Sequence, residues 1–501
     1  MVNKVQKMKL SFEPTYKAMF EAYEYQQKAV DAIKDLEYGA IFHEQGLGKT
    51  KIAIDILLHW LNKEIVDVVL IVTKKQLIAN WIGEIKEHTG LKPAILTSDK
   101  NENYYVFNGK NRLVLTNFEV LNTEIKRFRN YLDILNVGII IDESAKLKNP
   151  ASKLTQTFFE LSSKFKRRII MTGTPIANRP YDIWSQIYFL DFGKSLGNNF
   201  IEFKSQTNLS NKFATNTNKA EEYEIITSSI FSKISSFSVR ETKDSGIISL
   251  PDKVYKNIYI DFENEQYKMY EKIREEMQVL VEKNNKTFID DSSASLKRLL
   301  RLVQVTSNPK LIDELYFGPS AKEVELDKII KKIIGRNEKC IVWSSFIENV
   351  DYFHSKYRDI GSVKIHGKMS IESRVKSVDR FKNDPTVSVL FATPQSAKEG
   401  LTLTVANNVV FYDRGFSLDD YLQAQDRIHR ISQKKVCNIY NLIIKESIDE
   451  WVDILLKAKH QSAKLGQGDI DIEQYRKNID YSFGEIIKNI LGGNLDEHNK
   501  N

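Results

Sequence analysis

Near its start the chain carries the stretch Gln45-Gly46-Leu47-Gly48-Lys49-Thr50, which decides how the rest of the sequence is interpreted. An apolar run at residues 40–42 precedes it, and residues 51–58 follow it with helical periodicity. A strand, a glycine-rich turn and a helix in this order let backbone N–H groups and a helix N-terminus surround a polyphosphate. Gly46 and Gly48 allow positive φ and a close approach of the backbone. The stretch therefore predicts an α/β fold with a loop that binds the phosphates of ATP or GTP.

Each member of this loop has an expected role. The Lys49 ammonium is expected to reach the β- and γ-phosphates, and the Thr50 hydroxyl is expected to hold Mg²⁺. Gln45, Gly46, Leu47 and Gly48 are expected to line the nucleotide. The usual pattern has a glycine where this chain has His43, so the match is incomplete. The alternative is an ordinary glycine-rich turn that ends in a surface lysine, and the motifs further along argue against it.

Bulk composition limits the class of protein. The 501 residues allow two or three large domains, and 42% hydrophobic with 28% charged residues describe a globular, soluble chain. A net charge of +7 permits a polyanionic partner. The two cysteines form no CxxC pattern, which argues against a disulfide scaffold or a zinc site and favours a reducing compartment. No secretory signal or membrane-spanning run is visible, so we expect a cytoplasmic protein, in the host cytoplasm if phage-encoded.

The first half of the chain alternates strand-like and helical patterns, as in a doubly wound α/β domain. Buried parallel strands are predicted at residues 68–72, 113–117, 137–141 and 168–171. Upstream of the loop, Gln26 opens a helical pattern. Its amide pairs a donor with an acceptor, which suits the edge of adenine, although Gln26 taken alone is typical of a surface glutamine.

Two carboxylates, Asp142 and Glu143, follow the strand predicted at residues 137–141. Downstream of a phosphate loop, Asp142 is expected to hold Mg²⁺ and Glu143 to orient and deprotonate the attacking water. A simple helix N-cap is the alternative interpretation. The presence of both halves of the constellation favours catalysis.

The strand predicted at residues 168–171 runs into Thr172-Gly173-Thr174 before Pro175. A β-turn is the plain interpretation of this sequence, because glycine and proline punctuate loops. The two hydroxyls that flank Gly173 are instead candidates for sensing the γ-phosphate region and coupling its state to the rest of the protein.

A polar middle region separates two α/β lobes. The expected domains are an N-terminal ATP-binding lobe at 1–240, with a helical insertion at about 191–235, a linker with a helical insertion at 241–320, a second lobe at 321–465, and a tail at 466–501. In the second lobe, strands are predicted at residues 339–345, 363–367, 387–393 and 409–413. A second phosphate loop does not occur in this half of the sequence.

Residues 423–433 are predicted to form a helix that carries Arg427 and Arg430. Their spacing of three places them on one helix face. An arginine pair that faces the first lobe would stabilise the charge developing on the γ-phosphate once the lobes close. Taken alone, a surface arginine pair is the simpler interpretation. His429 is interpreted as structural.

The order of these motifs resembles the Swi/Snf-type branch of the superfamily-two helicases, and most closely its short phage and bacterial forms. The resemblance covers residues 20 to 445. It rests on the phosphate loop, residues 423–433 and these strings: Tyr25-Gln26, Asn80-Trp81, Asp142-Glu143 with Lys148-Asn149, Thr172-Gly173-Thr174-Pro175 with Asn178, Leu250-Pro251-Asp252-Lys253, His366-Gly367 and Gly400-Leu401-Thr402-Leu403.

The resemblance implies two RecA-like lobes with parallel sheets, ATP and Mg²⁺ as cofactors, and a monomeric, DNA-stimulated ATPase that moves along duplex or branched DNA. Gly400 is expected at the nucleotide. The family contacts the backbone of one strand without reading sequence, and such contacts set register only. Carried over by position, the contacting residues are Lys74, Thr116, Asn117, Ser344, Thr393 and Thr402.

The chain departs from the family at four places. Ala145 replaces the usual histidine after the acidic pair, and Lys74 replaces a proline. His43 stands in place of an aspartate, and Ala397-Lys398 replace paired glycines before Gly400. None of these changes removes a residue that ATP hydrolysis requires.

Two other functions stay open at this stage. One is a nucleotide-gated clamp that binds DNA or a protein without moving, and the intact Lys49, Glu143 and arginine pair argue against it. The other is an RNA-directed helicase of the same superfamily, against which Asn178 and residues 423–433 weigh.

Overall fold

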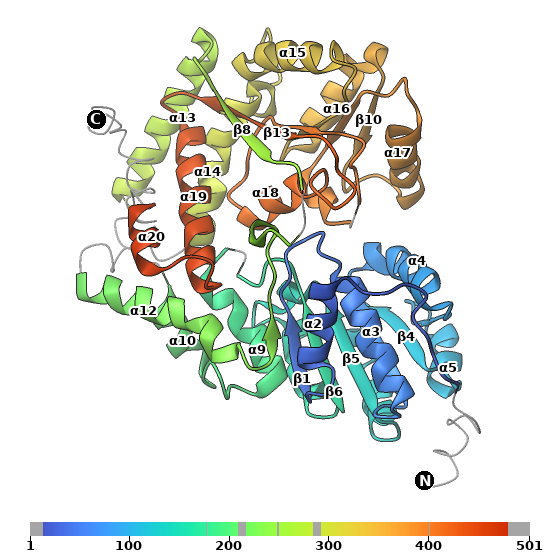
Figure 1. Ribbon diagram of the computed structural model, residues 1–501. Coiled ribbons are helices and arrows are strands. Elements are labelled where there is room, and N and C mark those ends of the chain that lie inside the picture. Colours follow the sequence, from blue (N-terminus) through green and yellow to red (C-terminus); the bar gives the residue numbers. More distant parts are fainter. Residues whose placement is uncertain are drawn as a thin grey trace. The chain divides into compact units, whose positions relative to one another are not determined.

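The computed structural model describes residues 14–176, 178–208, 217–247, 250–283, 292–399 and 401–478. The chain divides into two compact units (Figure 1). Unit 1 comprises Met1–Asn208, Glu221–Ile248 and Ser462–Ile472, and unit 2 contains Ser249–Gln461 as its main part. Each unit is built on its own parallel sheet.

Unit 1 holds a sheet with the strand order β3-β4-β2-β5-β6-β1-β7, in which every pairing is parallel. The central strands are buried on both faces, as expected for a parallel sheet covered by helices. The strands are β1 (Tyr38–Ile41), β2 (Val68–Thr73), β3 (Ala94–Ile95), β4 (Leu113–Asn117), β5 (Val137–Asp142), β6 (Arg167–Met171) and β7 (Ser238–Val239).

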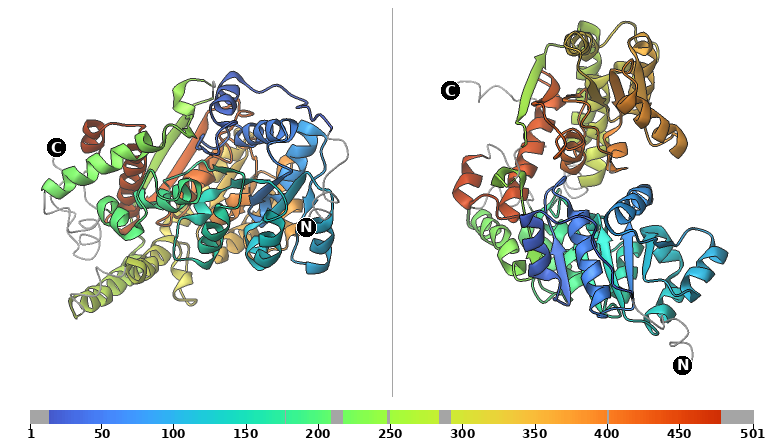
Figure 2. Two further views of the ribbon diagram at one scale, coloured as in Figure 1. Left: turned by 90° about the horizontal axis from the view of Figure 1, so that it is seen from below. Right: turned by 45° about the vertical axis from the view of Figure 1, so that its right-hand side comes forward.

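Along the chain, the helices of unit 1 alternate with these strands, and in space they pack around the sheet (Figures 1 and 2). They are α2 (Glu24–Ile33), α3 (Lys49–Asn62), α4 (Ile78–Thr89), α5 (Lys100–Asn108), α6 (Phe118–Thr123), α7 (Ile125–Leu132), α8 (Lys153–Ser162), α9 (Trp184–Asp191), α10 (Phe200–Thr207) and α12 (Thr217–Ile234).

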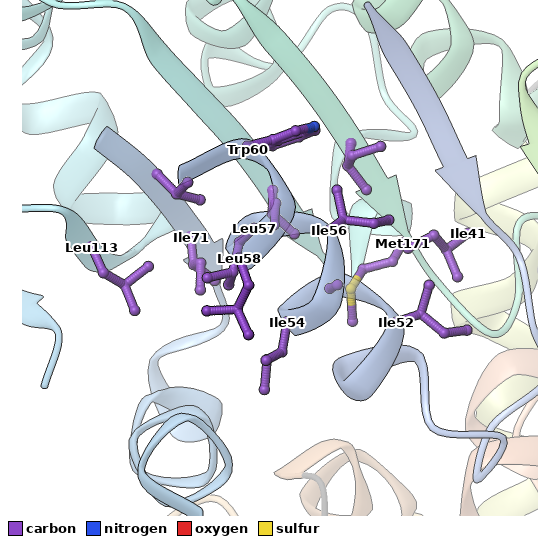
Figure 3. Close-up of a cluster of buried hydrophobic side chains, with 14 of the residues drawn as sticks. Ile41, Ile52, Ile54, Ile56, Leu57, Leu58, Trp60, Ile71, Leu113 and Met171 are labelled. Carbon is purple, nitrogen blue, oxygen red and sulfur yellow. The ribbon is translucent and has the colours of Figure 1, made fainter. Parts of the chain in front are cut away.

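Helix α3, which begins inside the phosphate loop, packs its apolar residues onto the sheet (Figure 3). Ile52, Ile56 and Trp60 of this helix are fully buried. The Trp60 ring needs a glycine beneath it, because a Cβ at Gly138 of β5 would lie 2.9 Å from the indole. Cutting such buried aliphatic side chains back to alanine typically costs about 2–5 kcal/mol, so this packing contributes strongly to the stability of α3 on the sheet.

Unit 2 holds a second parallel sheet with the order β10-β11-β9-β12-β13-β8. Two buried clusters cover its opposite faces. The strands are β8 (Lys253–Ile260), β9 (Cys340–Trp343), β10 (Ser362–Ile365), β11 (Val389–Ala392), β12 (Asn408–Phe411) and β13 (Cys437–Ile444). The expectation of two α/β lobes with parallel sheets is confirmed.

The helices of unit 2 are α13 (Asn264–Lys283), α14 (Ser292–Ser307), α15 (Ala321–Ile334), α16 (Ile347–Lys356), α17 (Ile371–Asn383), α18 (Leu418–Gln425) and most of α19 (Ile448–Gly466). A short α20 (Ile472–Lys477) follows. Within the described part of the chain, we find no helix whose length and hydropathy would let it cross a bilayer.

Two segments belong to a different part of the fold than their position in the sequence suggested. Residues 253–260, which we expected in the linker, pair along their whole length with β13 as an edge strand of the second sheet. Residues 462–472, at the junction of the expected second lobe and tail, belong to unit 1. Both placements depend on partners far away in the sequence, which local patterns do not report.

Candidate nucleotide site and family

The phosphate loop connects β1 to α3 at the carboxyl edge of the first sheet. Gly46 and Gly48 have φ of 88° and 70°, the left-handed region that favours glycine. The Lys49 ammonium donates to the backbone carbonyls of His43 at 2.9 Å and Glu44 at 3.2 Å. The lysine thus lies along the inner side of its own loop, where it can reach a polyphosphate.

Gln26 of α2 lies directly over this loop. A Cβ at Gly48 would come within 2.1 Å of the Gln26 Nε2 atom, so the loop needs glycine at this point. Nε2 donates to the Leu47 carbonyl at 3.4 Å and to the Tyr25 hydroxyl at 3.3 Å. Oε1 accepts from the backbone of Tyr23 at 3.0 Å. Gln26 therefore lies at the loop as expected, with both ends of its amide bonded to protein, and the reading of adenine stays a prediction.

The acidic pair ends β5, and strand register explains its neighbours. Because Val72 of β2 pairs with Ile141 of β5, the next residues along the two strands, Thr73 and Asp142, lie side by side. The Thr73 hydroxyl donates to Oδ2 of Asp142 at 3.0 Å. The Trp81 indole of α4 donates to the same oxygen at 2.9 Å. The Asp142 carboxylate is thereby held in one orientation.

The environment of Asp142 raises its pKa above the usual value. Burial is the main cause, and the nearby charge of Glu143 acts in the same direction. Hydrogen bonds from Trp81 and Thr73, together with the charge of Lys49, lower the pKa and oppose this effect. The two donors therefore help to keep the carboxylate ionised, which is the form a metal ligand needs.

The register also brings together Lys74 and Glu143, the residues that directly follow the two strands. The Lys74 ammonium lies 3.2 Å from Oε2 of Glu143, and the two side chains are only 20% and 16% exposed. Glu143 has a φ of 55°, which is uncommon for a residue with a side chain. This backbone turn directs the chain from β5 into the following short helix (Ser144–Leu147).

Gly173, which follows β6, packs against the phosphate loop. A Cβ at this position would lie 2.6 Å from Cγ of Gln45 and 3.2 Å from the Lys49 ammonium. The Thr172 amide donates to the carbonyl of Ile41 at the end of β1, and the Thr174 amide donates to the Thr172 hydroxyl at 3.2 Å. Residues 172–174 thus lie beside the loop, as a coupling role requires.

A polar link connects the acidic pair to this segment. The Ser144 hydroxyl donates to Oε1 of Gln186 in α9 at 2.7 Å. Nε2 of Gln186 donates to the Pro175 carbonyl at 3.0 Å and to the Asp182 carbonyl at 3.1 Å. Ala145, which departs from the family pattern, has no part in this link. The sequence interpretation missed Gln186, and its signal was a lone amide within the apolar run at residues 183–190.

The residues at this edge fit ATP with Mg²⁺. Mg²⁺ is usually bound by one or two carboxylates together with substrate phosphates and water, so Asp142 and the half-buried Thr50 form a sufficient protein set. Within the described ranges no cluster of three metal-ligating side chains occurs. The buried Oε1 of Gln45 has no hydrogen-bond partner and is available to a ligand or its water.

In unit 2 the prediction of a helix over residues 423–433 is wrong in its extent. Helix α18 ends at Gln425, and the following residues form turns that are held by contacts distant in sequence. The Leu403 amide donates to the Arg427 carbonyl at 2.9 Å, and the Gln433 side-chain amide donates to the carbonyls of Thr404, Ala406 and Ile428. These bonds replace the helical ones, so Arg427 and Arg430 do not share a helix face.

Both arginines instead contact residues 401–402, which directly follow Gly400 in the sequence. Arg427, 2% exposed, donates to the Leu401 carbonyl at 3.3 Å. Arg430 donates to the Thr402 hydroxyl at 2.7 Å. Gly400, expected at the nucleotide, lies outside the described residues. His429 bonds the Pro251 carbonyl at 2.8 Å, in keeping with a structural role.

Most residues expected to contact DNA are buried. Thr116 and Asn117 end β4, and the Asn117 side chain caps α6 by accepting from the Val120 amide. Ser344 follows β9, is 1% exposed and donates to Asp413 at 2.5 Å. Thr393 follows β11 and is 7% exposed. Lys74 and Thr402 are half-buried.

Two family models match the chain. The SNF2-related domain matches residues 25–311, and the helicase conserved C-terminal domain matches residues 322–432. An "Uncharacterized ATP-dependent helicase" of Mycoplasma pneumoniae is 29% identical, over 85% of this chain and 40% of that protein. The "ISWI chromatin-remodeling complex ATPase ISW1" of Saccharomyces cerevisiae is 28% identical, over 88% of this chain and 39% of that protein.

The chain therefore spans about two fifths of the length of these curated relatives. Among solved structures, the "Sulfolobus solfataricus SWI2/SNF2 ATPase core in complex with dsDNA" is 25% identical, with a TM-score of 0.42, over 94% of this chain and 100% of that chain. With the SNF2-related model matching more than half of its residues and a helicase C-terminal domain following, the chain belongs to the Swi/Snf-type family of superfamily-two ATPases.

Proposed function

We propose that this ATPase is a DNA translocase that couples ATP hydrolysis to movement on double-stranded or branched DNA. The observation that carries the proposal is the arrangement at the edge of the first sheet. There the acidic pair, the Lys49 loop and Lys74, a candidate phosphate contact, belong to adjoining segments of one compact unit. The similarity to a chromatin-remodelling ATPase of Saccharomyces cerevisiae supports DNA as the partner, because chromatin is built on DNA.

In the proposed reaction Lys49 binds the β- and γ-phosphates, and Glu143 takes a proton from the attacking water. Thr50 and Asp142 would hold Mg²⁺, and the bound ion would neutralise charge on the phosphates. Residues 172–174 and Gln186 respond to the γ-phosphate and transmit its loss. Arg427 and Arg430 are the candidates that stabilise the charge developing on that phosphate.

The proposed DNA contacts are to the backbone and carry no sequence preference. Lys74 and Thr402 are the candidates for direct phosphate contact, because they are partly exposed. Thr116, Asn117, Ser344 and Thr393 are buried, so we propose that they mainly shape the loops that present backbone amides to phosphates.

The test is steady-state ATP turnover with duplex, forked, branched and single-stranded DNA and with RNA. Glu143→Gln should lower the stimulated turnover by about 10²–10⁴-fold, the usual contribution of a general base. A loss of only a few-fold would exclude Glu143 as the base. Displacement of a third strand from a DNA triplex should accompany hydrolysis.

Two outcomes would replace this proposal. Strong DNA-stimulated hydrolysis without triplex displacement would indicate a nucleotide-gated clamp. Stimulation by RNA that exceeds stimulation by every DNA substrate would indicate an RNA-directed enzyme.

A further inference from the structure

The ion pair between Lys74 and Glu143 joins two residues with different proposed roles, phosphate contact and catalytic base. Their distance of 3.2 Å and their low exposure show that each is the other's neighbour in the described state. The alignment of the two strands brings the pair together. The contact between Thr73 and Asp142 and the contact between Lys74 and Glu143 both span 69 residues of sequence. The pair is therefore a direct consequence of how β2 and β5 align.

The Glu143 carboxylate is held toward the Lys74 ammonium, whereas a general base must lie within hydrogen-bond reach of the water it deprotonates. The Glu143 backbone, with its φ of 55°, restricts where the side chain can go. While Lys74 stays in place, the direction of the Glu143 carboxylate is thus restrained.

Lysine is well suited to exchange partners. Its ammonium is a compact, hydrated charge on a flexible stem and binds phosphate readily. Lys146 and Lys148 are exposed on the segment that follows Glu143, so further cations lie close to the pair in sequence. A DNA strand presents one phosphate about every 3.4 Å, and its negative charge attracts these exposed lysines as well as Lys74.

We propose that Lys74 is a positioning residue that restrains Glu143 until a nucleic-acid phosphate draws the lysine away. The inference rests on the proposed function and specifies how DNA stimulates hydrolysis. Phosphate binding by Lys74 releases the Glu143 carboxylate, which then turns to the attacking water. In this chain the device depends on Lys74, the position at which the resembling family usually has a proline.

The experiment compares Lys74→Met with Lys75→Met in the full chain. The second variant makes the same change of charge at an exposed neighbour that does not contact Glu143. Without DNA, Lys74→Met should raise kcat about five-fold, the equivalent of releasing an ion pair worth about 1 kcal/mol, and leave the KM for ATP unchanged. Lys75→Met should leave DNA-free turnover at the wild-type level, and Lys74→Arg should restore low DNA-free turnover.

DNA should then stimulate Lys74→Met about five-fold less than the wild type, because part of the activation is already present. Equal or lower DNA-free kcat in Lys74→Met than in Lys75→Met would overturn the inference and leave Lys74 as a phosphate contact alone. A wild-type protein that ignores DNA would overturn the translocase proposal instead. The DNA-free kcat values of Lys74→Met and Lys75→Met test the role of Lys74 even in that case.

Discussion

The Trp81 indole of α4 donates a hydrogen bond to the Asp142 carboxylate of β5, across 61 residues of sequence and at 2.9 Å. The family string Asn80-Trp81 therefore contacts the acidic pair directly. Together with Thr73, this indole opposes the burial that raises the pKa of Asp142. A packing residue of the helix thus limits the rise in the pKa of a candidate metal ligand.

We expect Trp81→Phe to weaken Mg²⁺ binding and to narrow the pH range of the ATPase. Without the indole donor the pKa of Asp142 rises further, so activity is lost at a higher pH as the solution is acidified. The measurement is kcat against pH and Mg²⁺ concentration. Trp184→Phe is the control, since it removes an indole bond to the Gly197 carbonyl in the same unit. An unchanged acid limb in Trp81→Phe would show that this bond does not tune Asp142.

Gly173→Ala should impair catalysis because the added methyl would meet Gln45 and Lys49. Overpacking of this kind typically costs about 1–3 kcal/mol, and here the strain falls on the phosphate loop. We expect ATP turnover to fall about ten-fold or more, with a higher KM for ATP. Gly83→Ala in α4 meets no atom within 4 Å and should stabilise its helix by about 1 kcal/mol. Normal turnover in both variants would exclude tight packing at Gly173.

Gln186→Leu should separate the acidic pair from residues 172–175. It leaves the Ser144 hydroxyl without its acceptor and the Pro175 carbonyl without its donor, at about 1–3 kcal/mol for each buried group. We expect a marked loss of stability and of ATP turnover. A double-mutant cycle with Ser144→Ala checks the link, and a coupling energy below about 0.5 kcal/mol would mean that the two side chains act separately.

His43 should make the stability of unit 1 depend on pH. Burial lowers its pKa from 6.5 to about 4, and the Lys49 charge adds to this effect. Because the folded pKa is below the unfolded one, the neutral form stabilises the fold above pH 6.5. That contribution is lost as the pH falls toward 4, and the loss at pH 5 is about 2 kcal/mol.

The measurement for His43 is urea unfolding at pH 7.5 and pH 5 for the wild type and His43→Gln. The variant should show a pH dependence smaller by about 2 kcal/mol. Equal pH dependence in both proteins would mean that His43 titrates normally in the folded state.

Local patterns in the sequence determined the phosphate loop, the central strands and the position of the acidic pair. Gly46, Gly48 and Lys49 indicated the phosphate loop, because only certain residue types allow its backbone and charge. Runs of β-branched residues indicated the central strands, since strands buried on both faces must be apolar throughout. The acidic pair was recognisable because it ends such a strand. These signals lie within a few residues of the features that they predict.

The tertiary structure alone decided which distant residues meet. The register of β2 against β5 pairs Lys74 with Glu143 and Thr73 with Asp142, and no local pattern encodes a register between strands. The turns that carry Arg427 and Arg430 replace the expected helix, because bonds to residues 401–406 outweigh a local helical preference. Residues 253–260 belong to the second sheet only because they pair with β13, and their extended pattern alone does not indicate which strand they join. Local elements can be recognised from short stretches of sequence. Contacts between distant segments form only when the whole chain folds, so the tertiary structure is needed to identify them.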